Sequence, residues 1–325
     1  MSKWINILQT DPIPRLLSPD DRALVYFVRR DLLGEKVEPI EELWKTPDTL
    51  KLVKKQQENG SWRYPGQRRD ANTYTNYDLL ETFRSLRVLV EMHGFNRDHP
   101  TIPKAASYAF SCQTEEGDIR GILGNQYIPY YHAAILELLV KAGYEDDARV
   151  DKGFEWLLSV RQDDGGWIIP MQAVPSKERT DEMWRGAPIP PDRSRPFSHL
   201  ATGMVLRAFA AHPRYRQSEE ARLAGEQLKT RFFKSDKYND RKTPQYWLKF
   251  QYPFWWTDII TALDSLSWLG FSADDADIQK GLDWFISNQE ESGLWPTGYG
   301  KGKRVEKEKA WVGLAIGRVL KRFYG

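Results

Sequence analysis

The sequence has almost no cysteine, little net charge and no long apolar run, and each absence excludes a class of protein. The one cysteine of the 325-residue chain, Cys112, excludes an intramolecular disulfide and a metal site built from several thiolates. A formal net charge of +2 gives no strong field toward nucleic acid, so none is expected as a partner. No run of about eighteen apolar residues suggests a membrane-spanning helix. Because the first residues also lack a signal-peptide layout, we expect a cytoplasmic protein.

Aromatic side chains are abundant, with 13 Trp, 15 Tyr and 14 Phe. A core of large aromatics accounts for most of them. Aromatic faces also hold apolar ligands and stabilise cations, so a cavity lined by aromatic side chains is the more specific interpretation.

A short polar motif recurs along the chain, with a glycine in each copy and, in three of the four copies, a tryptophan two residues after it. Its four copies are residues 56–62, 113–119, 161–167 and 289–295. The glycines at 60, 117 and 165 follow one another closely, whereas the step to the glycine at 293 is about twice as long. We therefore expect one degenerate copy between the last two, at residues 232–247.

The segment before each motif has the apolar spacing of a helix with one buried face. Ile102, Ala106, Ala109 and Phe110 show this spacing, and it recurs from Val150 and from Ile278. A more apolar segment follows each motif, and such helices are buried on both faces. These inner helices are expected at residues 74–93, 127–142, 198–211, 255–269 and 307–323. An extra inner helix is expected at 20–33, ahead of the first outer helix, from the start signals of Ser18-Pro19-Asp20-Asp21. The pattern predicts an all-α protein, an (α/α)6 toroid that forms a single domain over residues 1–325.

The Gln-x-x-Asp/Glu-Gly-x-Trp motif resembles the repeat of squalene and oxidosqualene cyclases and of protein prenyltransferase beta subunits. The resemblance covers residues from about 40 to the end and implies an alpha/alpha toroid in which the motif Gln and Trp join the repeats. Ile119 departs from it at the Trp position of the second copy. The Asp-x-Asp-Asp acid of the cyclases is absent, and Cys112 alone does not suggest the zinc site of the prenyltransferases. No metal and no cofactor are therefore expected.

Polar and aromatic residues near the expected starts of the inner helices are the candidates for chemistry. His132, Asp78 and Asp258 are predicted to transfer protons. Each has a structural alternative, since an acid in a first helical turn caps the helix and a buried histidine is often simply hydrogen-bonded. The residues predicted to contact substrate are Tyr77, Tyr131, His199, Trp255 and Arg185.

Residues 167–198 have no helical period and contain six prolines. A loop of this length in a compact domain is usually functional or disordered, so we expect a lid over the cavity. Arg185 would bring positive charge to a phosphate or carboxylate there. The alternative is an ordinary surface loop.

Three functions are compatible with these observations. The first is a terpenoid-cyclase-like enzyme that acts on an isoprenoid or other apolar small molecule by acid–base or carbocation chemistry. The second is a carbohydrate-active lyase or hydrolase, a class that also uses helical toroids and paired carboxylates. The third is a binding scaffold without catalysis, since repeat proteins bind partners on concave faces and fold alone does not give function.

Overall fold

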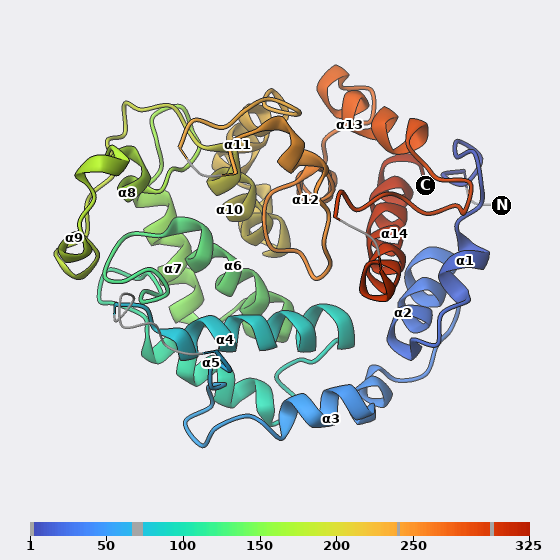
Figure 1. Cartoon of the computed structure of the whole chain (residues 1–325), viewed down its shortest axis with the longest axis horizontal. Coiled ribbons are helices and arrows are strands. Elements are labelled where there is room, and N and C mark those ends of the chain that lie inside the picture. The colour runs from blue at the N-terminus through green and yellow to red at the C-terminus, as the bar shows by residue number, and fades with distance from the viewer. Residues whose placement is uncertain (1–2, 67–73, 239–240, 300–301) are drawn as a thin grey trace.

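The computed structural model describes residues 3–66, 74–238, 241–299 and 302–325, and these form helices and loops without a named strand. The helices are arranged in a ring of inner and outer layers, as Figure 1 shows. This arrangement confirms the predicted all-α toroid. Within the described residues, no helix is both long enough and apolar enough to cross a membrane.

Six helices form the inner layer, and the first three continue into a π-helical turn. They are α2 (Arg22–Phe27, continued over Val28–Leu33), α4 (Tyr77–Leu86, continued over Arg87–Met92), α6 (Pro129–Leu139, continued over Val140–Tyr144), α10 (His199–Ala211), α12 (Ile259–Trp268) and α14 (Lys303–Tyr324). Every side chain of α6 is buried, as its apolar sequence predicts. Helix α10 packs between α6 and α12, and α12 packs against α14.

The outer helices are α3 (Pro47–Val53), α5 (Thr101–Ser111), α7 (Ala148–Ser159), α11 (Glu219–Lys229) and α13 (Ala276–Ser287). Each buries one face, and the predicted stripe Ile102, Ala106, Ala109 and Phe110 is buried. Short helices lie in the connections: α1 (Ile13–Leu17), α8 (Pro170–Ala173), α9 (Asp181–Arg185) and 3-10 turns at Ile40–Lys45, Ser176–Glu178, Tyr215–Gln217 and Pro244–Leu248.

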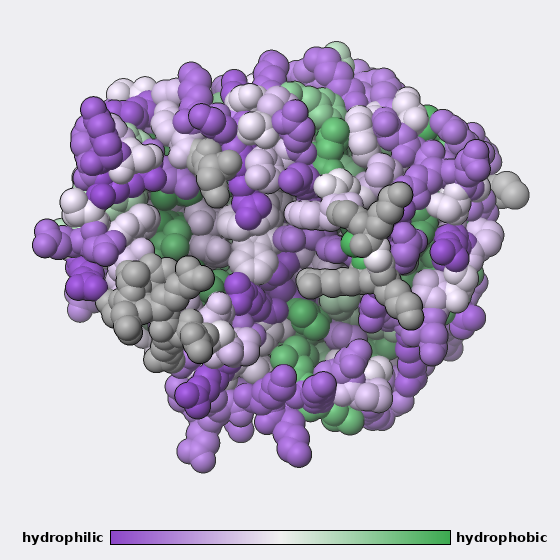
Figure 2. Space-filling model, viewed as in Figure 1, coloured by the Kyte–Doolittle hydropathy of each residue, from purple (hydrophilic) through white to green (hydrophobic). Residues whose placement is uncertain are grey.

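Motif glutamines join neighbouring repeats, since Gln56 Nε2 donates to the carbonyl of Thr101 at 2.9 Å, whereas the motif tryptophans bond to the outer helix of their own repeat. The indole Nε1 of Trp62, Trp167 and Trp295 donates to the carbonyl ten residues earlier, at 2.9, 2.7 and 2.7 Å. Trp247 donates to the carbonyl of Lys234, thirteen residues earlier, at 2.9 Å, a related contact within the degenerate copy predicted at 232–247. Figure 2 shows the surface of the ring from one side. Hydrophilic residues cover its rim, and apolar residues lie in hollows nearer its middle.

A glutamine of the last motif closes the ring. Gln289 Nε2 donates to the carbonyl of Thr10 at 2.8 Å, and its Oε1 accepts from the Thr10 amide at 3.0 Å. Trp311 of α14 donates to Asp21 Oδ2 at 3.1 Å, so the last inner helix is bound to the start of the first. Both termini accordingly lie on the same side of the ring in Figure 1.

Several predicted helix starts are corrected by the structure: α4 begins at Tyr77 rather than 74, and α14 at Lys303 rather than 307. The first inner helix begins at Arg22 rather than at about residue 20, and its cap is Asp21, whose carboxylate accepts from the Leu24 amide. Helix α12 begins at Ile259 after its cap Asp258 and not at residue 255. Trp255 and Trp256 therefore lie in a loop, where both rings join one aromatic cluster with centroids 5.7 Å apart.

Candidate functional site

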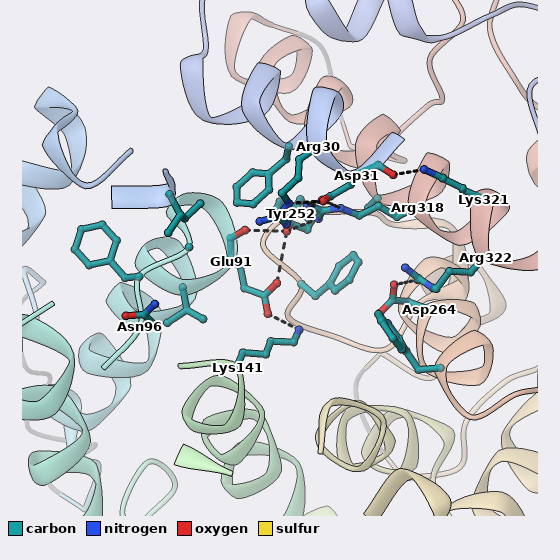
Figure 3. A pocket seen from close by; sticks show the side chains of 18 residues that line it. Arg30, Asp31, Glu91, Asn96, Lys141, Tyr252, Asp264, Arg318, Lys321 and Arg322 are labelled. Carbon is teal, nitrogen blue, oxygen red and sulfur yellow. Dashed lines mark hydrogen bonds and ion pairs between the residues drawn. The ribbon is translucent and has the colours of Figure 1, made fainter. Parts of the chain in front are cut away.

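A cavity of about 810 Å³ lies at the C-terminal ends of the inner helices. It is lined by Phe27, Arg30, Asp31, Ile40, Val90, Glu91, Gly94, Phe95, Asn96, Lys141, Tyr252, Phe254, Asp264, Trp268, Ala315, Arg318, Lys321 and Arg322. Its volume is within the range of small-molecule sites. We call it the main pocket. Figure 3 shows its labelled side chains, which extend toward one another from separate helices.

The π-helical turns that end α2, α4 and α6 contribute polar residues to this pocket. Arg30 and Asp31 come from the first turn, Glu91 from the second and Lys141 from the third. Turns of this kind widen a helix locally and are frequent at functional sites. Basic side chains suit this end of the ring because the C-terminal ends of helices carry partial negative charge.

Arg318 of α14 binds the first inner helix at one side of the pocket. Its Nε and Nη2 donate to Asp31 Oδ2 at 2.8 and 2.5 Å. Burial opposes the ionisation of Asp31, but Arg318 and Arg30 outweigh it and keep the pKa of this carboxyl below its usual value. Lys321 donates to the carbonyls of Asp31 and Leu32 at 2.8 and 3.2 Å, which satisfies two groups that the helix end leaves free.

A second set of contacts continues from Tyr252 across the ring. Its hydroxyl accepts from Arg318 Nη1 at 3.2 Å and donates to the carbonyl of Glu91 at 3.1 Å. Lys141 Nζ then donates to Glu91 Oε1 at 2.6 Å and to Glu137 Oε1 at 2.7 Å. Burial raises the pKa of Tyr252 to about 12, so its phenol is neutral near pH 7 and serves as a hydrogen-bond donor.

The remaining inner helices join the same polar set. Arg207 of α10 pairs with Glu137, with Nη2 2.6 Å from Oε2, and both side chains are almost fully buried. Arg322 of α14 pairs with Asp264 of α12, and its Nε donates to Ser267 Oγ at 2.7 Å. Every inner helix thus supplies a charged side chain to this end of the ring.

The loop before α12 forms the floor of the pocket. Buried Arg87 holds this loop, since its guanidinium donates to the carbonyls of Pro253 and Phe254. Burial lowers the pKa of Arg87 to about 9. Tyr252 and Phe254 line the pocket, whereas Trp255 packs beside Phe83 with centroids 5.4 Å apart.

The structure places His132 in a structural contact between repeats. Its Nδ1 accepts from the Ile119 amide at 2.9 Å, and its Nε2 lies 3.0 Å from the Gly153 carbonyl. Thr82 and Thr202 accept from the amides of Trp62 and Trp167 in the same way in two other repeats. Burial lowers the pKa of His132 to about 4, so the ring is neutral near pH 7. His132 does not line the main pocket.

The two predicted acids lie in first helical turns, outside the main pocket. Asp78 Oδ1 is 3.5 Å from the Tyr64 amide. Asp258 is buried and forms a capping box with Thr261, whose amide donates to Oδ1 at 2.8 Å. Burial raises the pKa of Asp258 to about 7. Its role in proton transfer stays a prediction.

The predicted substrate contacts do not gather in one place. Tyr131 and Trp255 belong to one aromatic cluster, with centroids 6.4 Å apart, and Tyr77 packs against Tyr64 at 4.8 Å. Buried His199 stacks on Trp247 at 4.6 Å, with Nδ1 3.5 Å from a carboxylate oxygen of Asp236. Burial lowers the pKa of His199 to about 4.

Arg185 ends α9 and is exposed within the long loop. The loop packs on residues 124–127: Gln126 Nε2 donates to the Met183 carbonyl at 2.5 Å, and its Oε1 accepts from the Ile189 amide at 2.9 Å. No residue of 167–198 lines the main pocket. The proposed lid would therefore have to cover another part of the ring.

The charged residues at this end of the ring were not predicted from the sequence, although a signal was present. Glu137 and Arg207 each stand alone within the apolar sequences of α6 and α10. A charge that must be buried needs a partner, so these two residues indicated a paired site inside the ring.

No family model and no curated protein match the sequence. Among solved structures, a complex of the type II terpene cyclase MstE from Scytonema with geranylgeranyl dihydroxybenzoate is 11% identical, with a TM-score of 0.46 over 99% of this chain and 87% of that one. A polysaccharide lyase is 13% identical, with a TM-score of 0.47 over 86% and 85% of the two chains. An alpha-amylase from Clostridium perfringens is 15% identical, with a TM-score of 0.43 over 85% and 79%. Likeness at this level concerns the fold alone.

Asp258 gives a test of the effect of burial on an acid, through pH. Its pKa is about 7 in the folded chain, whereas the ordinary pKa of an aspartic acid is 3.8, so the folded state binds the proton more tightly than the unfolded state. The stability that this adds is fully present below pH 4 and is lost as the pH rises through 7. Asp258→Asn keeps the capping oxygen, and we expect it to raise the free energy of unfolding by up to about 3 kcal/mol at pH 8 and much less at pH 5.

Urea unfolding of the parent chain and the variant at both pH values measures this difference. Comparison at each pH removes the contribution of other titrating groups, including His132 and His199. An equal effect of the substitution at pH 5 and pH 8 would mean that the carboxyl titrates normally.

Proposed function

We propose that the chain binds an amphiphilic small molecule in the main pocket, one with an isoprenoid-like apolar body and an anionic group. The observation that carries the proposal is a cavity of about 810 Å³ whose wall combines aromatic side chains with an excess of basic ones. Binding sites of this size commonly combine an apolar lining with a few polar groups that orient the ligand.

The apolar part of the wall supports an apolar ligand body. Phe27, Phe95 and Phe254 supply aromatic rings, and Ile40 and Val90 supply aliphatic side chains. Burial of apolar ligand area on such a wall drives binding, and aromatic faces also stabilise cationic character in a reacting ligand.

The charged part of the wall supports an anionic group. Five basic side chains line the main pocket, against three carboxylates. Guanidinium groups match the planar oxygens of carboxylate and the oxygens of phosphate.

Acid-initiated chemistry, as in a terpenoid cyclase, needs a carboxylic acid that keeps its proton near pH 7. Among the described carboxyls with a resolved shift, Asp258 is the one whose pKa is raised. It lies at the start of α12, whereas Asp264 and Trp268 of the same helix line the pocket. We therefore assign binding to the main pocket and keep Asp258 as the candidate proton donor.

Binding is tested by calorimetry with farnesyl phosphate and farnesol, on the parent chain and on Ile40→Trp, which adds bulk at the pocket wall. We expect farnesyl phosphate to bind more tightly than farnesol and Ile40→Trp to weaken both. Leu50→Trp on α3 is the matched control, since Leu50 is 54% exposed and does not line the pocket. Failure of both ligands to bind the parent chain would refute the proposal.

Carbohydrate binding is the second candidate, and one observation favours it. Trp268 lines the pocket while 50% exposed, as expected for a ring on which a sugar stacks. Acidic and neutral oligosaccharides belong in the same calorimetric series. Binding of an oligosaccharide, with no response to farnesyl phosphate, would favour this candidate.

A further inference from the structure

A smaller cavity of about 180 Å³ adjoins the main pocket. It is lined by Glu137, Lys141, Arg207, Ala210, Ala211, Arg216, Asp264 and Trp268. Lys141, Asp264 and Trp268 line both cavities, so the two lie side by side. We call the smaller one the side pocket.

The carboxylates of the side pocket are already neutralised by the protein. Glu137 is bound by Lys141 at 2.7 Å and by Arg207 at 2.6 Å, and these two cations keep the pKa of its carboxyl low in spite of its burial. Asp264 is paired with Arg322, which lines the main pocket. Neither acid is left as a free negative charge that would repel an anion.

Two basic side chains of the side pocket have a donor or a charge that no described protein group pairs with. Arg207 is 4% exposed, and its Nη2 and Nη1 contact Glu137 and the Trp255 carbonyl, but its Nε has no hydrogen-bond partner. A buried donor without a partner costs free energy that a ligand acceptor would recover. Within the described part of the chain, Arg216 makes no ion pair. Its guanidinium lies over the ring of Trp268, 5.6 Å from the ring centroid.

We propose that the side pocket is a subsite for an oxyanion, the carboxylate or phosphate group of a small molecule, which binds between Arg207 and Arg216. Arg207 supplies a buried positive charge in the wall of the side pocket, and Arg216 supplies a charge that no ion pair among the described residues neutralises. The extension that the rest of the ligand occupies the main pocket rests on the proposed function; the anion subsite itself does not.

Trp268 gives this subsite its position. The guanidinium of Arg216 lies 5.6 Å from its ring centroid and that of Arg322 lies 5.1 Å away. One indole thus contacts a basic side chain of each pocket, at the boundary that the two pockets share. A molecule that crosses this boundary would place its anion beside Arg216 and its body against the aromatic wall. Arg216 is then the residue that selects anionic over neutral ligands.

Calorimetric titration with inorganic phosphate and with acetate, at constant ionic strength in chloride, tests the subsite on the full chain. Arg216→Gln removes the charge without breaking an ion pair, so we expect a folded protein whose phosphate affinity falls about tenfold. Arg216→Lys should retain part of the affinity. Arg63→Gln is the matched control, because Arg63 is exposed and does not line either pocket. Equal phosphate affinity in the parent and Arg216→Gln, or an equal loss in Arg63→Gln, would overturn the subsite.

Comparison of farnesyl phosphate with farnesol separates this inference from the proposed function. If the subsite holds, Arg216→Gln weakens farnesyl phosphate and leaves farnesol unchanged. If phosphate binding depends on Arg216 while neither prenyl compound binds, the subsite stands and the proposed function fails. If both prenyl compounds bind with no dependence on Arg216, the proposed function stands and the subsite fails. The acetate and phosphate titrations show which oxyanion the subsite prefers.

Discussion

Glu137→Gln should lower the free energy of unfolding by roughly 3–5 kcal/mol, because it removes one member of a buried ion pair and leaves the other uncompensated. Arg207 is 4% exposed and has its charge neutralised by Glu137. Lys141 also loses one of its two carboxylates. Gln keeps the size of the side chain, so the effect is electrostatic. Urea unfolding followed by circular dichroism measures it.

The double variant Glu137→Met with Arg207→Met is the control for this prediction. Replacement of both charges by apolar side chains of similar length leaves no unpaired arginine, and such replacements are often neutral or stabilising. We expect it to be clearly more stable than Glu137→Gln. If the single variant lost less than about 1 kcal/mol, as exposed ion pairs do, the pair would have to be hydrated.

Trp295→Ala should cost roughly 3–5 kcal/mol, the usual effect of truncating a fully buried large aromatic side chain. Trp295 has no exposed surface, and its indole Nε1 donates to the carbonyl of Phe285 at 2.7 Å. The substitution leaves a cavity in the last motif and a carbonyl without its partner. Trp295→Phe keeps most of the volume, so its smaller loss, about 1–2 kcal/mol, reports mainly the hydrogen bond.

Trp268→Ala is the matched control, because the same side chain is removed from a position that is 50% exposed. We expect its effect on stability to stay below about 1 kcal/mol, as is usual for surface substitutions. Chemical unfolding of the three variants gives the comparison. Equal losses at Trp295 and Trp268 would contradict the structural role of the motif tryptophan.

The ring was predictable because its signals are local and repeated. Each motif copy fixes a turn after an outer helix, and the buried stripe that begins at Ile102 recurs in the other outer helices. The error at the start of α12 has a physical cause. The aromatic run Phe254, Trp255 and Trp256 extends the apolar pattern, but Asp258 caps the helix only after it.

The site was less predictable because its parts are far apart in the sequence. Asp31 and Arg318 form one ion pair, and Glu91 and Lys141 another, across separations that no periodic pattern encodes. The site was predicted at the N-terminal ends of the inner helices, and His132 was therefore named. The structure shows His132 in a contact between repeats. The isolated charge of Glu137 pointed to the other end of the ring.

The hydrogen bonds between Gln289 and Thr10 make the two ends of the chain neighbours. An open array of repeats needs special first and last units, because each end has an uncovered face. Here the first and last units pack against each other, so the packing does not depend on which repeat comes first in the chain. A circular permutant with the old termini joined, and new ones opened at an exposed turn such as Pro213–Arg214, would keep the packing of the inner helices and lose only the local turn at His212. The toroid therefore has a start and an end in its covalent chain but not in its architecture.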